Sequence, residues 1–244
     1  MENLNEDVVN PKEQIPRYET FNTFFTNPHG KGVSFGNRQM VLDGLYTKYA
    51  KLYEVKSKEF KLRILRIGKD LFFQIAVPSE TVDNLTYDVV IQFVDGVGKS
   101  NLANTEVKVF SNSPSFVFTY AYAFHAGKLL VKDLVSKMSS TAITTVPIVK
   151  NTELVTGFEK TLFYAYFYIT LTNPATKSDF FNKMAVGASS ATLKKLVKST
   201  DEKDIEYRTL KKAMSTSKKL AKSTTPTKKI KLSSVTKNKV VNLK

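Results

Sequence analysis

The sequence predicts an α+β protein with an antiparallel, β-rich body, sandwich-like or barrel-like, that carries peripheral helices and a basic, helical or extended C-terminal arm. Three observations support this prediction. Short stretches in which apolar residues alternate with other residues recur between residues 62 and 149, separated by Gly, Pro, Asn and Asp. Stretches with a helical spacing of apolar residues flank them on both sides. Lysine accumulates without acidic residues after residue 210.

The composition sets limits on the fold and on its chemistry. With 244 residues and 42% hydrophobic side chains, the chain has enough apolar surface to bury a core. It has no cysteine, which excludes disulfides and thiolate-bound zinc or iron–sulfur sites. Residues 1–17 lack the basic and apolar regions of a secretory signal. The longest apolar stretches, 116–124 and 162–171, have about half the length of a membrane-spanning helix. We therefore expect a soluble protein, made inside the cell, with no membrane partner.

The N-terminal region should contain an extended arm, an aromatic anchor and one helix. Residues 1–18 are polar and include two prolines, which suits an extended arm. Three phenylalanines next to an Asn-Pro-His-Gly turn at 27–30 should start the body: Phe21, Phe24 and Phe25. An amphipathic helix should follow over 37–54, because apolar residues recur there at intervals of three or four and Asn37 is a good N-cap.

The central region shows a series of strand patterns. Residues 62–67 and 71–77 are apolar, and the Gly-Lys-Asp turn at 68–70 between them predicts a hairpin. Residues 85–94 have the most regular alternation of the chain and should form a half-buried strand. A shorter strand is expected at 106–110.

Two aromatic stretches, 116–124 and 162–169, have a similar texture of aromatic and small residues. We favour a strand for the first, with a buried helix that has Pro114 in its first turn as the alternative. The two stretches should pair in one sheet or stack in one core. A helix is expected at 128–138 and a further short strand at 143–149.

Helical patterns dominate after residue 174. A short helix should dock through Phe180, Phe181 and Met184, and helices at 191–198 and 201–221 should follow. Ser199 and Glu202 form a capping-box pattern at the start of the last helix. Its apolar stripe is thin and consists of Ile205, Leu210 and Met214. This helix should therefore pack weakly or wait for a partner.

The charge distribution indicates polyanions as a class of partner. Residues 211–244 hold 11 lysines and no acidic residue, which leaves 26 basic and 22 acidic side chains in the rest of the chain. The predicted organisation is an N-terminal arm (1–18), a β-rich body (19–188), a helical segment (189–221) and a basic extended tail (222–244). The candidate polyanion-binding residues are Lys211, Lys212, Lys218, Lys219, Lys222, Lys228, Lys229 and Lys231. Such lysines bind phosphate backbones through counterion release, without reading sequence. An acidic protein surface and a merely solubilising tail remain alternatives.

Motifs for catalysis or cofactors are weak. Residues 95–100 (Asp-Gly-Val-Gly-Lys-Ser) resemble the end of a phosphate-binding loop but lack its first glycine, and a strand rather than a helix is expected after them. His29 and His125 have no ligand or triad partner at a suitable spacing. We therefore expect no cofactor, no metal site and no enzymatic activity.

Tyrosine is frequent in the two aromatic stretches. These side chains are either core residues or contacts in a protein interface, because tyrosine tolerates a partly solvent-exposed position. The candidate interface residues are Tyr120, Tyr122, Tyr166 and Tyr168.

The abundance of Lys, Asn, Ser, Thr, Tyr and Phe, together with a β-rich body and two arms, resembles the structural proteins of tailed phages with AT-rich genomes. The resemblance implies a homo-oligomeric capsid, neck or tail protein, made in the host cytoplasm and located in the virion. Its partners would be other virion proteins, itself and, through the C-terminal arm, DNA. The alternative is an accessory protein that binds nucleic acid without sequence specificity, for which the body offers one basic cluster: Lys56, Lys58, Lys61, Arg63 and Arg66.

Overall fold

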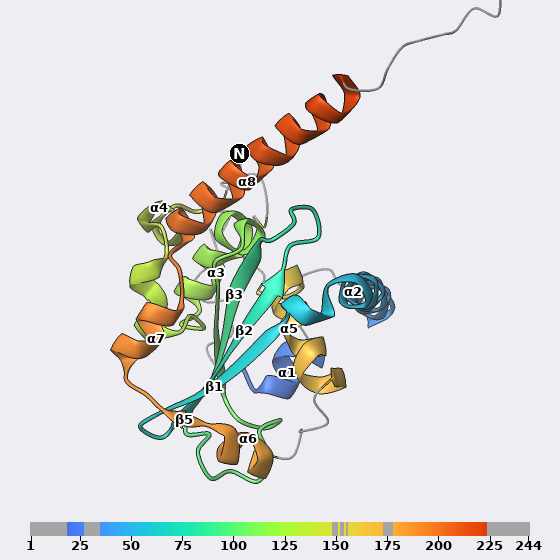
Figure 1. The fold of residues 1–244 in the computed structure, drawn as a ribbon. Helices are drawn as coiled ribbons and strands as arrows, with labels where there is room; N and C mark the ends of the chain where they lie inside the picture. The colour runs from blue at the N-terminus through green and yellow to red at the C-terminus, as the bar shows by residue number, and fades with distance from the viewer. Residues whose placement is uncertain are drawn as a thin grey trace, which may run out of the picture.

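The computed structural model describes residues 19–26, 35–147, 151, 154, 156–172 and 178–223. The expected N-terminal arm lies outside these residues. Within them the fold is α+β: helices pack against one five-stranded mixed sheet with the order β4-β3-β2-β1-β5 (Figure 1). The strands are β1 (Lys61–Ile67), β2 (Asp70–Pro78), β3 (Thr86–Phe93), β4 (Val107–Ser111) and β5 (Val186–Gly187).

The sheet confirms the strand predictions for the central region. β1 and β2 form the expected hairpin, with Ile67 opposite Asp70 and with Gly68 at a φ of +61°, which glycine adopts without steric cost. β3 and β4 continue the sheet in antiparallel pairing. β5, which the sequence did not predict, pairs with β1 in parallel through two residues.

The β3 strand was expected to be half-buried, but helices cover both faces of the sheet. Because side chains alternate along a strand, Phe73 and Ile91 share one face and Gln74 and Asp88 the other. The first face packs against α1, α5 and α6, as the contact between the rings of Phe73 and Phe181 illustrates. The second face carries the connection from α7 to α8, and Figure 1 shows α7 on the opposite side of the sheet from α5.

The expected sandwich or barrel was not found in the described part of the chain. The sheet is open, with β4 and β5 at its edges, and helices take the place of a second sheet. The outer edge of β4 is covered by other parts of the chain: the Val107 amide donates to the Glu19 carbonyl at 2.8 Å, and the Val109 amide donates to the Leu129 carbonyl at 2.8 Å.

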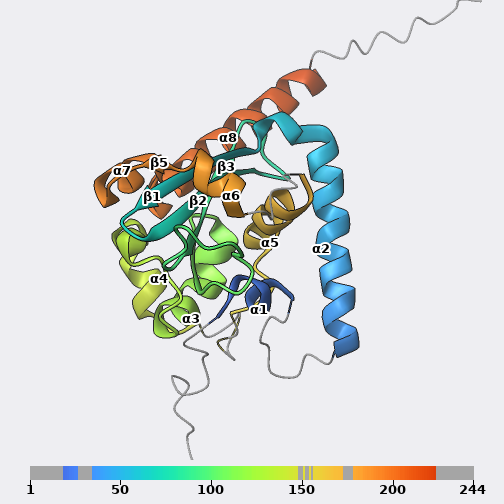
Figure 2. The ribbon, with the colours of Figure 1, turned by 90° about the horizontal axis from the view of Figure 1, so that it is seen from below.

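Two N-terminal helices complete the first layer. The phenylalanines of α1 (Phe21–Thr26) are buried, which confirms the aromatic anchor. The expected amphipathic helix is α2 (Phe35–Lys56), which is longer than predicted and buries Leu45, Tyr49 and Leu52. It lies beside α5, where Tyr49 contacts the ring of Phe167 (Figure 2).

Both aromatic stretches are helical, so the strand favoured for 116–124 was wrong and its alternative, a buried helix, was right; for 162–169 the choice between strand and helix had been left open. The first forms η3 (Phe116–Tyr120), a π-helical turn, and α3 (Ala121–Ala126); the second forms α5 (Lys160–Phe167) and the π-helical η5 (Tyr168–Thr172). Each begins with a side-chain cap, from Ser113 in the first case and from Glu159 in the second. Their rings share one core, which confirms the stacking alternative.

The segment between these stretches also differs from expectation. The helix expected at 128–138 is shorter, a 3₁₀ turn η4 (Lys132–Lys137), because Lys128 has a φ of +58° and Leu130 bridges to the sheet. The first two residues of the strand expected at 143–149 belong instead to the short helix α4 (Ser140–Thr144). Residues 148–150 lie outside the described part.

The C-terminal helices follow the predicted order: α6 (Ser178–Met184), α7 (Ser190–Leu196) and α8 (Thr200–Ser223). In α6, Phe181 is buried while Phe180 and Met184 are about half exposed. Leu193 of α7 and Val197 belong to the main core, so the chain reaches α8 from a firmly packed position.

Candidate functional site

The candidate site is built on α8, where some of the predicted lysines lie. Lys211 and Lys212 are exposed on this helix, and the Lys211 ammonium donates to the Tyr207 hydroxyl at 3.0 Å. Lys218, Lys219 and Lys222 fall within the bounds of α8, but their side chains are outside the described part of the structure. Lys228, Lys229 and Lys231 lie outside the described residues altogether.

The predicted capping box starts α8. The Ser199 hydroxyl accepts a hydrogen bond from the Glu202 amide at 3.2 Å, and the Ser199 amide donates to the Glu202 carboxylate at 2.6 Å. The hydrogen bonds that the Ser199 amide and the Ser199 hydroxyl donate to the carboxylate lower the pKa of Glu202. The reciprocal pairing satisfies amide groups that a helix start otherwise leaves without a partner.

A buried polar network fixes the connection that leads into α8. The Asn112 amide group donates to the Asp88 carboxylate and to the Lys198 carbonyl, each at 3.0 Å. The same carboxylate accepts from the Lys198 amide at 3.2 Å and from Gln74 at 2.9 Å. The start of α8 is thereby tied to β3 and to the end of β4.

The middle of α8 packs against the loop before β3 and against β3 itself. Tyr207, Leu210 and Met214 contact a small cluster that consists of Val82, Leu85 and Tyr87. Burial raises the pKa of the Tyr87 hydroxyl. Ile205, the third residue of the predicted stripe, is 66% exposed. The stripe is therefore as thin as expected, but two of its three residues hold the helix on the body.

Charge divides along α8. Its first two turns carry the acidic residues Asp201, Glu202, Asp204 and Glu206, whereas lysines occupy the half that begins at Lys211. This order complements the helix dipole, which favours negative charge at the N-terminus and positive charge at the C-terminus. Figure 1 shows the second half of α8 extending past the sheet and the helices that pack on it. The lysine-bearing half thus points away from the body.

The acidic half also contains two basic residues, Arg208, which pairs with Asp204 at 2.7 Å, and Lys203. The Lys203 side chain is only 5% exposed, and its ammonium lies 2.9 Å from the Glu206 carboxylate, which also pairs with Lys198 at 3.0 Å. Burial raises the pKa of Glu206, but the hydrogen bonds and charges of the two lysines outweigh it and bring the pKa below its ordinary value. Lys203 therefore has a structural role and is not available to an external anion.

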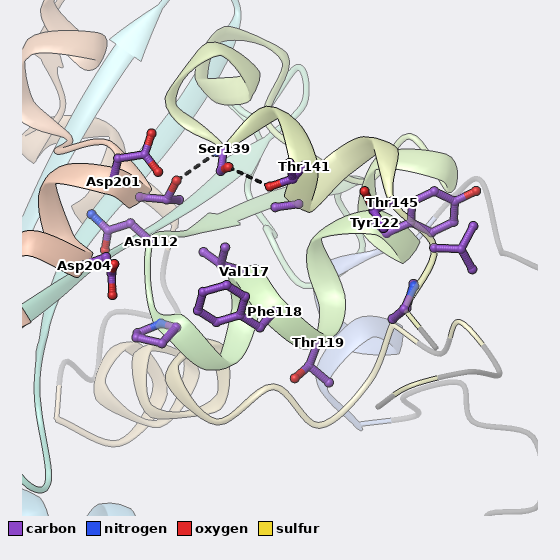
Figure 3. Close-up of a pocket in the computed structure, with 15 residues that line it drawn as sticks. Asn112, Val117, Phe118, Thr119, Tyr122, Ser139, Thr141, Thr145, Asp201 and Asp204 are labelled. Atoms are coloured by element: carbon purple, nitrogen blue, oxygen red, sulfur yellow. Dashed lines mark hydrogen bonds between the residues drawn. The ribbon is translucent and has the colours of Figure 1, made fainter. Parts of the chain in front are cut away.

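A groove lies beneath the first half of α8. It consists of two adjoining pockets of about 650 and 310 Å³, which share Pro114, Phe118 and Asp204 as lining residues. We call it the Phe118 groove. In Figure 3, Phe118 and Val117 come from η3, Asp201 and Asp204 come from α8, and Ser139 and Thr141 come from the start of α4. The Ser139 amide donates to the Thr200 hydroxyl at 2.8 Å and so holds the base of α4 against α8.

The smaller pocket borders a set of buried polar groups that sequence reasoning missed. Glu159 is 1% exposed and accepts hydrogen bonds from Ser113 at 3.2 Å, Thr161 at 2.7 Å and the Leu162 amide at 2.8 Å. Burial raises the pKa of this carboxyl despite these bonds. Glu159 is the N-cap of α5, but glutamate is not among the residues that usually mark a helix start in a sequence.

A second carboxylate lies on the wall of the same pocket. Glu80 accepts a hydrogen bond from the Tyr164 hydroxyl and pairs with Lys160 at 2.9 Å. Burial raises the pKa of Glu80, but these two partners outweigh it and hold the pKa below its ordinary value. Burial and the neighbouring carboxylate raise the pKa of Tyr164. The three groups satisfy one another, so this arrangement is a closed network rather than an activated nucleophile.

The four candidate interface tyrosines are all partly buried. Tyr166 stacks on Phe25 with ring centroids 4.5 Å apart, and Tyr168 stacks on Phe60 at 5.1 Å. Tyr122 lines the larger pocket, and burial raises the pKa of Tyr120. The structure thus gives Tyr166 and Tyr168 packing roles within the subunit, while their role in an interface stays a prediction.

The basic cluster expected on the body is divided between two faces. Lys61 and Arg63 share one face of β1, whereas Arg66 lies on the other. Lys56 is committed to the Ser79 carbonyl and to Asp83, both at 3.0 Å. These residues therefore do not form one continuous surface.

Other candidate chemistry stays isolated. His125 is exposed at the end of α3, and His29 lies outside the described residues. Within the described residues, no group of three or more His, Asp or Glu side chains is arranged to hold a metal ion. The Asp-Gly-Val-Gly-Lys-Ser segment forms turns between β3 and β4, with Gly98 at a φ of +77°. No helix in the described part of the chain is long and apolar enough to cross a bilayer.

Comparison with known proteins adds no relative: no family model, curated protein or solved structure matches this chain.

Proposed function

We propose that this protein is a non-enzymatic structural protein of a phage particle, and that its lysine-rich C-terminal segment binds polyanions, either packaged nucleic acid or acidic surfaces of neighbouring subunits. The observation that carries the proposal is the division of charge along α8. The acidic half is anchored on the body, and the lysine-bearing half extends beyond it without acidic residues that would neutralise it.

The physical basis is electrostatic. Lysines on an extended segment release counterions when they meet a phosphate backbone, and the resulting affinity does not depend on base sequence. Lysine also lacks the planar, bidentate geometry with which arginine reads guanine, so we expect no sequence preference. An assembly protein needs this kind of contact, because it must hold any stretch of the packaged molecule.

The alternative, a free nucleic-acid-binding accessory protein, requires a basic surface on the body. The division of Lys61 and Arg63 from Arg66 across the two faces of β1 weakens that alternative. Such an accessory protein would be monomeric in solution and would gain mass or stability only when nucleic acid is added.

Truncation after Ser217 tests the proposal while keeping the contacts of Leu210 and Met214 with the body. We expect the full chain to bind duplexes of unrelated sequence equally, with an affinity that falls steeply with salt, by about 0.9 in the logarithmic slope for each phosphate neutralised. The truncated chain should lose this binding. Fluorescence anisotropy at several salt concentrations measures both.

The matched control replaces Lys228, Lys229 and Lys231 with arginine, which keeps the charge and should keep the binding. Binding that survives truncation, or that depends on duplex sequence, would contradict the proposal. The mass in solution without nucleic acid separates the two candidates: a stable oligomer supports a structural protein, and a monomer supports the accessory protein.

A further inference from the structure

The Phe118 groove presents an apolar side chain to solvent at the junction of its two pockets. Phe118 is 69% exposed although it belongs to a helical turn whose neighbours Phe116 and Val117 are buried. Val146 and Pro147 extend the apolar lining of the larger pocket, and Val146 is 46% exposed. An exposed aromatic ring beside a concave apolar surface is typical of a site that binds another polypeptide.

The charges of the groove select the class of polypeptide. Asp201 and Asp204 are the charged residues that line the larger pocket. The smaller pocket adds Glu80 and Lys160, which pair with each other. Asp204 pairs at 2.7 Å with Arg208, whose side chain is 75% exposed. Asp201, Asp204 and Glu80 thus outnumber by one the cations Arg208 and Lys160 that pair with them, so the groove suits a segment that combines apolar side chains with ammonium groups.

The chain itself contains such a segment. Residues 228–232 read Lys-Lys-Ile-Lys-Leu, with two apolar side chains among three lysines and no acidic residue nearby. In sequence they follow the end of α8 by five residues. The groove and a segment with complementary charge and apolar side chains are thus present in one polypeptide.

Distance favours docking between two copies. α8 carries the chain from Asp204 to Ser223, which at 1.5 Å per residue is about 28 Å away from the groove. The five residues from 223 to 228 span at most about 18 Å when fully extended. Lys228 and Lys229 therefore cannot return to the groove of their own subunit. Leu232, nine residues after Ser223 and at most about 32 Å away, could return only if the chain reversed directly and stayed fully extended. A neighbouring copy imposes no such requirement.

We propose that the Phe118 groove binds residues 228–232 of a second copy of this chain. The inference rests on the proposed structural function and identifies the neighbouring surface that the basic segment meets. Ile230 and Leu232 fill the apolar pocket beside Phe118, and the flanking lysines meet Asp201 and Asp204.

The test uses full-length chains and the mass in solution over a range of protein concentrations. The wild type should self-associate, and Phe118→Ala should weaken this association about tenfold or more, as expected for a central aromatic contact. Phe180→Ala is the matched control, because Phe180 is also an exposed phenylalanine but lies on α6, outside the groove. Asp201→Asn with Asp204→Asn should weaken association as well, whereas Asp43→Asn should not.

A mixing experiment tests whether the segment binds the groove of a neighbouring copy or that of its own subunit. At a protein concentration just above the dissociation constant of the wild type, neither Ile230→Ser/Leu232→Ser nor Phe118→Ala should self-associate. Mixed together they should form a heterodimer, because one supplies an intact segment and the other an intact groove. A monomeric wild type, unchanged association of Phe118→Ala, or failure of the mixture to associate would each overturn the inference.

The same variants keep this inference separate from the proposed function. Ile230→Ser/Leu232→Ser retains every lysine and should still bind DNA at low salt. If it binds DNA while Phe118→Ala associates like the wild type, the groove assignment is wrong and the polyanion proposal stands. If the wild type neither binds DNA nor associates, both are wrong.

Discussion

Asn112 occupies a junction between three elements of the fold. It is 1% exposed, and its side chain joins β3, the end of β4 and the carbonyl that precedes the α8 cap. Its removal would leave the Asp88 amide and carboxylate short of partners in a buried position. A buried polar group without a partner costs more than the hydrogen bond itself contributes.

Asn112→Ala should lower the free energy of unfolding by about 3 kcal/mol. Three hydrogen bonds are lost together, and Asp88 stays buried with fewer partners. Urea denaturation measures the effect. Asn101→Ala, in an exposed turn where the side chain accepts one hydrogen bond from Ala103, is the control and should cost much less. Equal losses in the two variants would show that the junction does not stabilise the fold as described.

Glu159 gives the protein a pH dependence of known sign. Burial raises its pKa in the folded state above that of the unfolded chain, so the folded state binds the additional proton. Stability from this group is therefore present at low pH and falls as the pH rises from about 4.5 through the raised pKa.

In Glu159→Gln this dependence is absent. We expect the free energy of unfolding of the variant, relative to the wild type, to increase with pH over that range. Urea titrations of both proteins at several pH values isolate Glu159, because Glu80, Glu202 and Glu206 titrate alike in the two. A relative stability that decreases with pH would mean that the carboxyl is held ionised.

At the scale of elements, α8 depends on its cap. Ser199→Ala should lower the free energy of unfolding by about 1 kcal/mol, because the Glu202 amide loses its acceptor. Ser215→Ala on the same helix is the matched control and should be neutral or slightly stabilising, since Ser215 is exposed and alanine favours the helix. Thermal or urea unfolding checks the pair, and equal effects would contradict a capping role.

Local patterns predicted some elements well and others poorly. The hairpin of β1 and β2 and the capping box of α8 were predictable because the deciding residues are neighbours in the sequence. α3 and α5 were not, because a short apolar stretch that is buried all round has the same composition as a buried strand. The N-caps Ser113 and Glu159 decide these cases, and their hydrogen bonds exist only in the folded chain.

At the scale of the whole molecule, the class of the fold was predictable and its closure was not. Alternating stretches predicted strands at β1 to β4, but the aromatic stretch 116–124, for which a strand was favoured, is helical, and the strands form one open sheet. The Phe118 groove likewise depends on long-range packing: Pro114, Val117 and Phe118 line one pocket with Asp201 and Asp204, more than eighty positions later in the sequence. The charge division of α8, by contrast, could be read directly from the sequence.

The covered edge of β4 limits how copies of this protein can join. With the amides of Val107 and Val109 already engaged by Glu19 and Leu129, an incoming backbone finds no free ladder on that side. Addition of a strand at this edge would first require Glu19 and Leu129 to leave β4. Any polypeptide that binds at this side would therefore contact side chains, so single substitutions there would alter the contact.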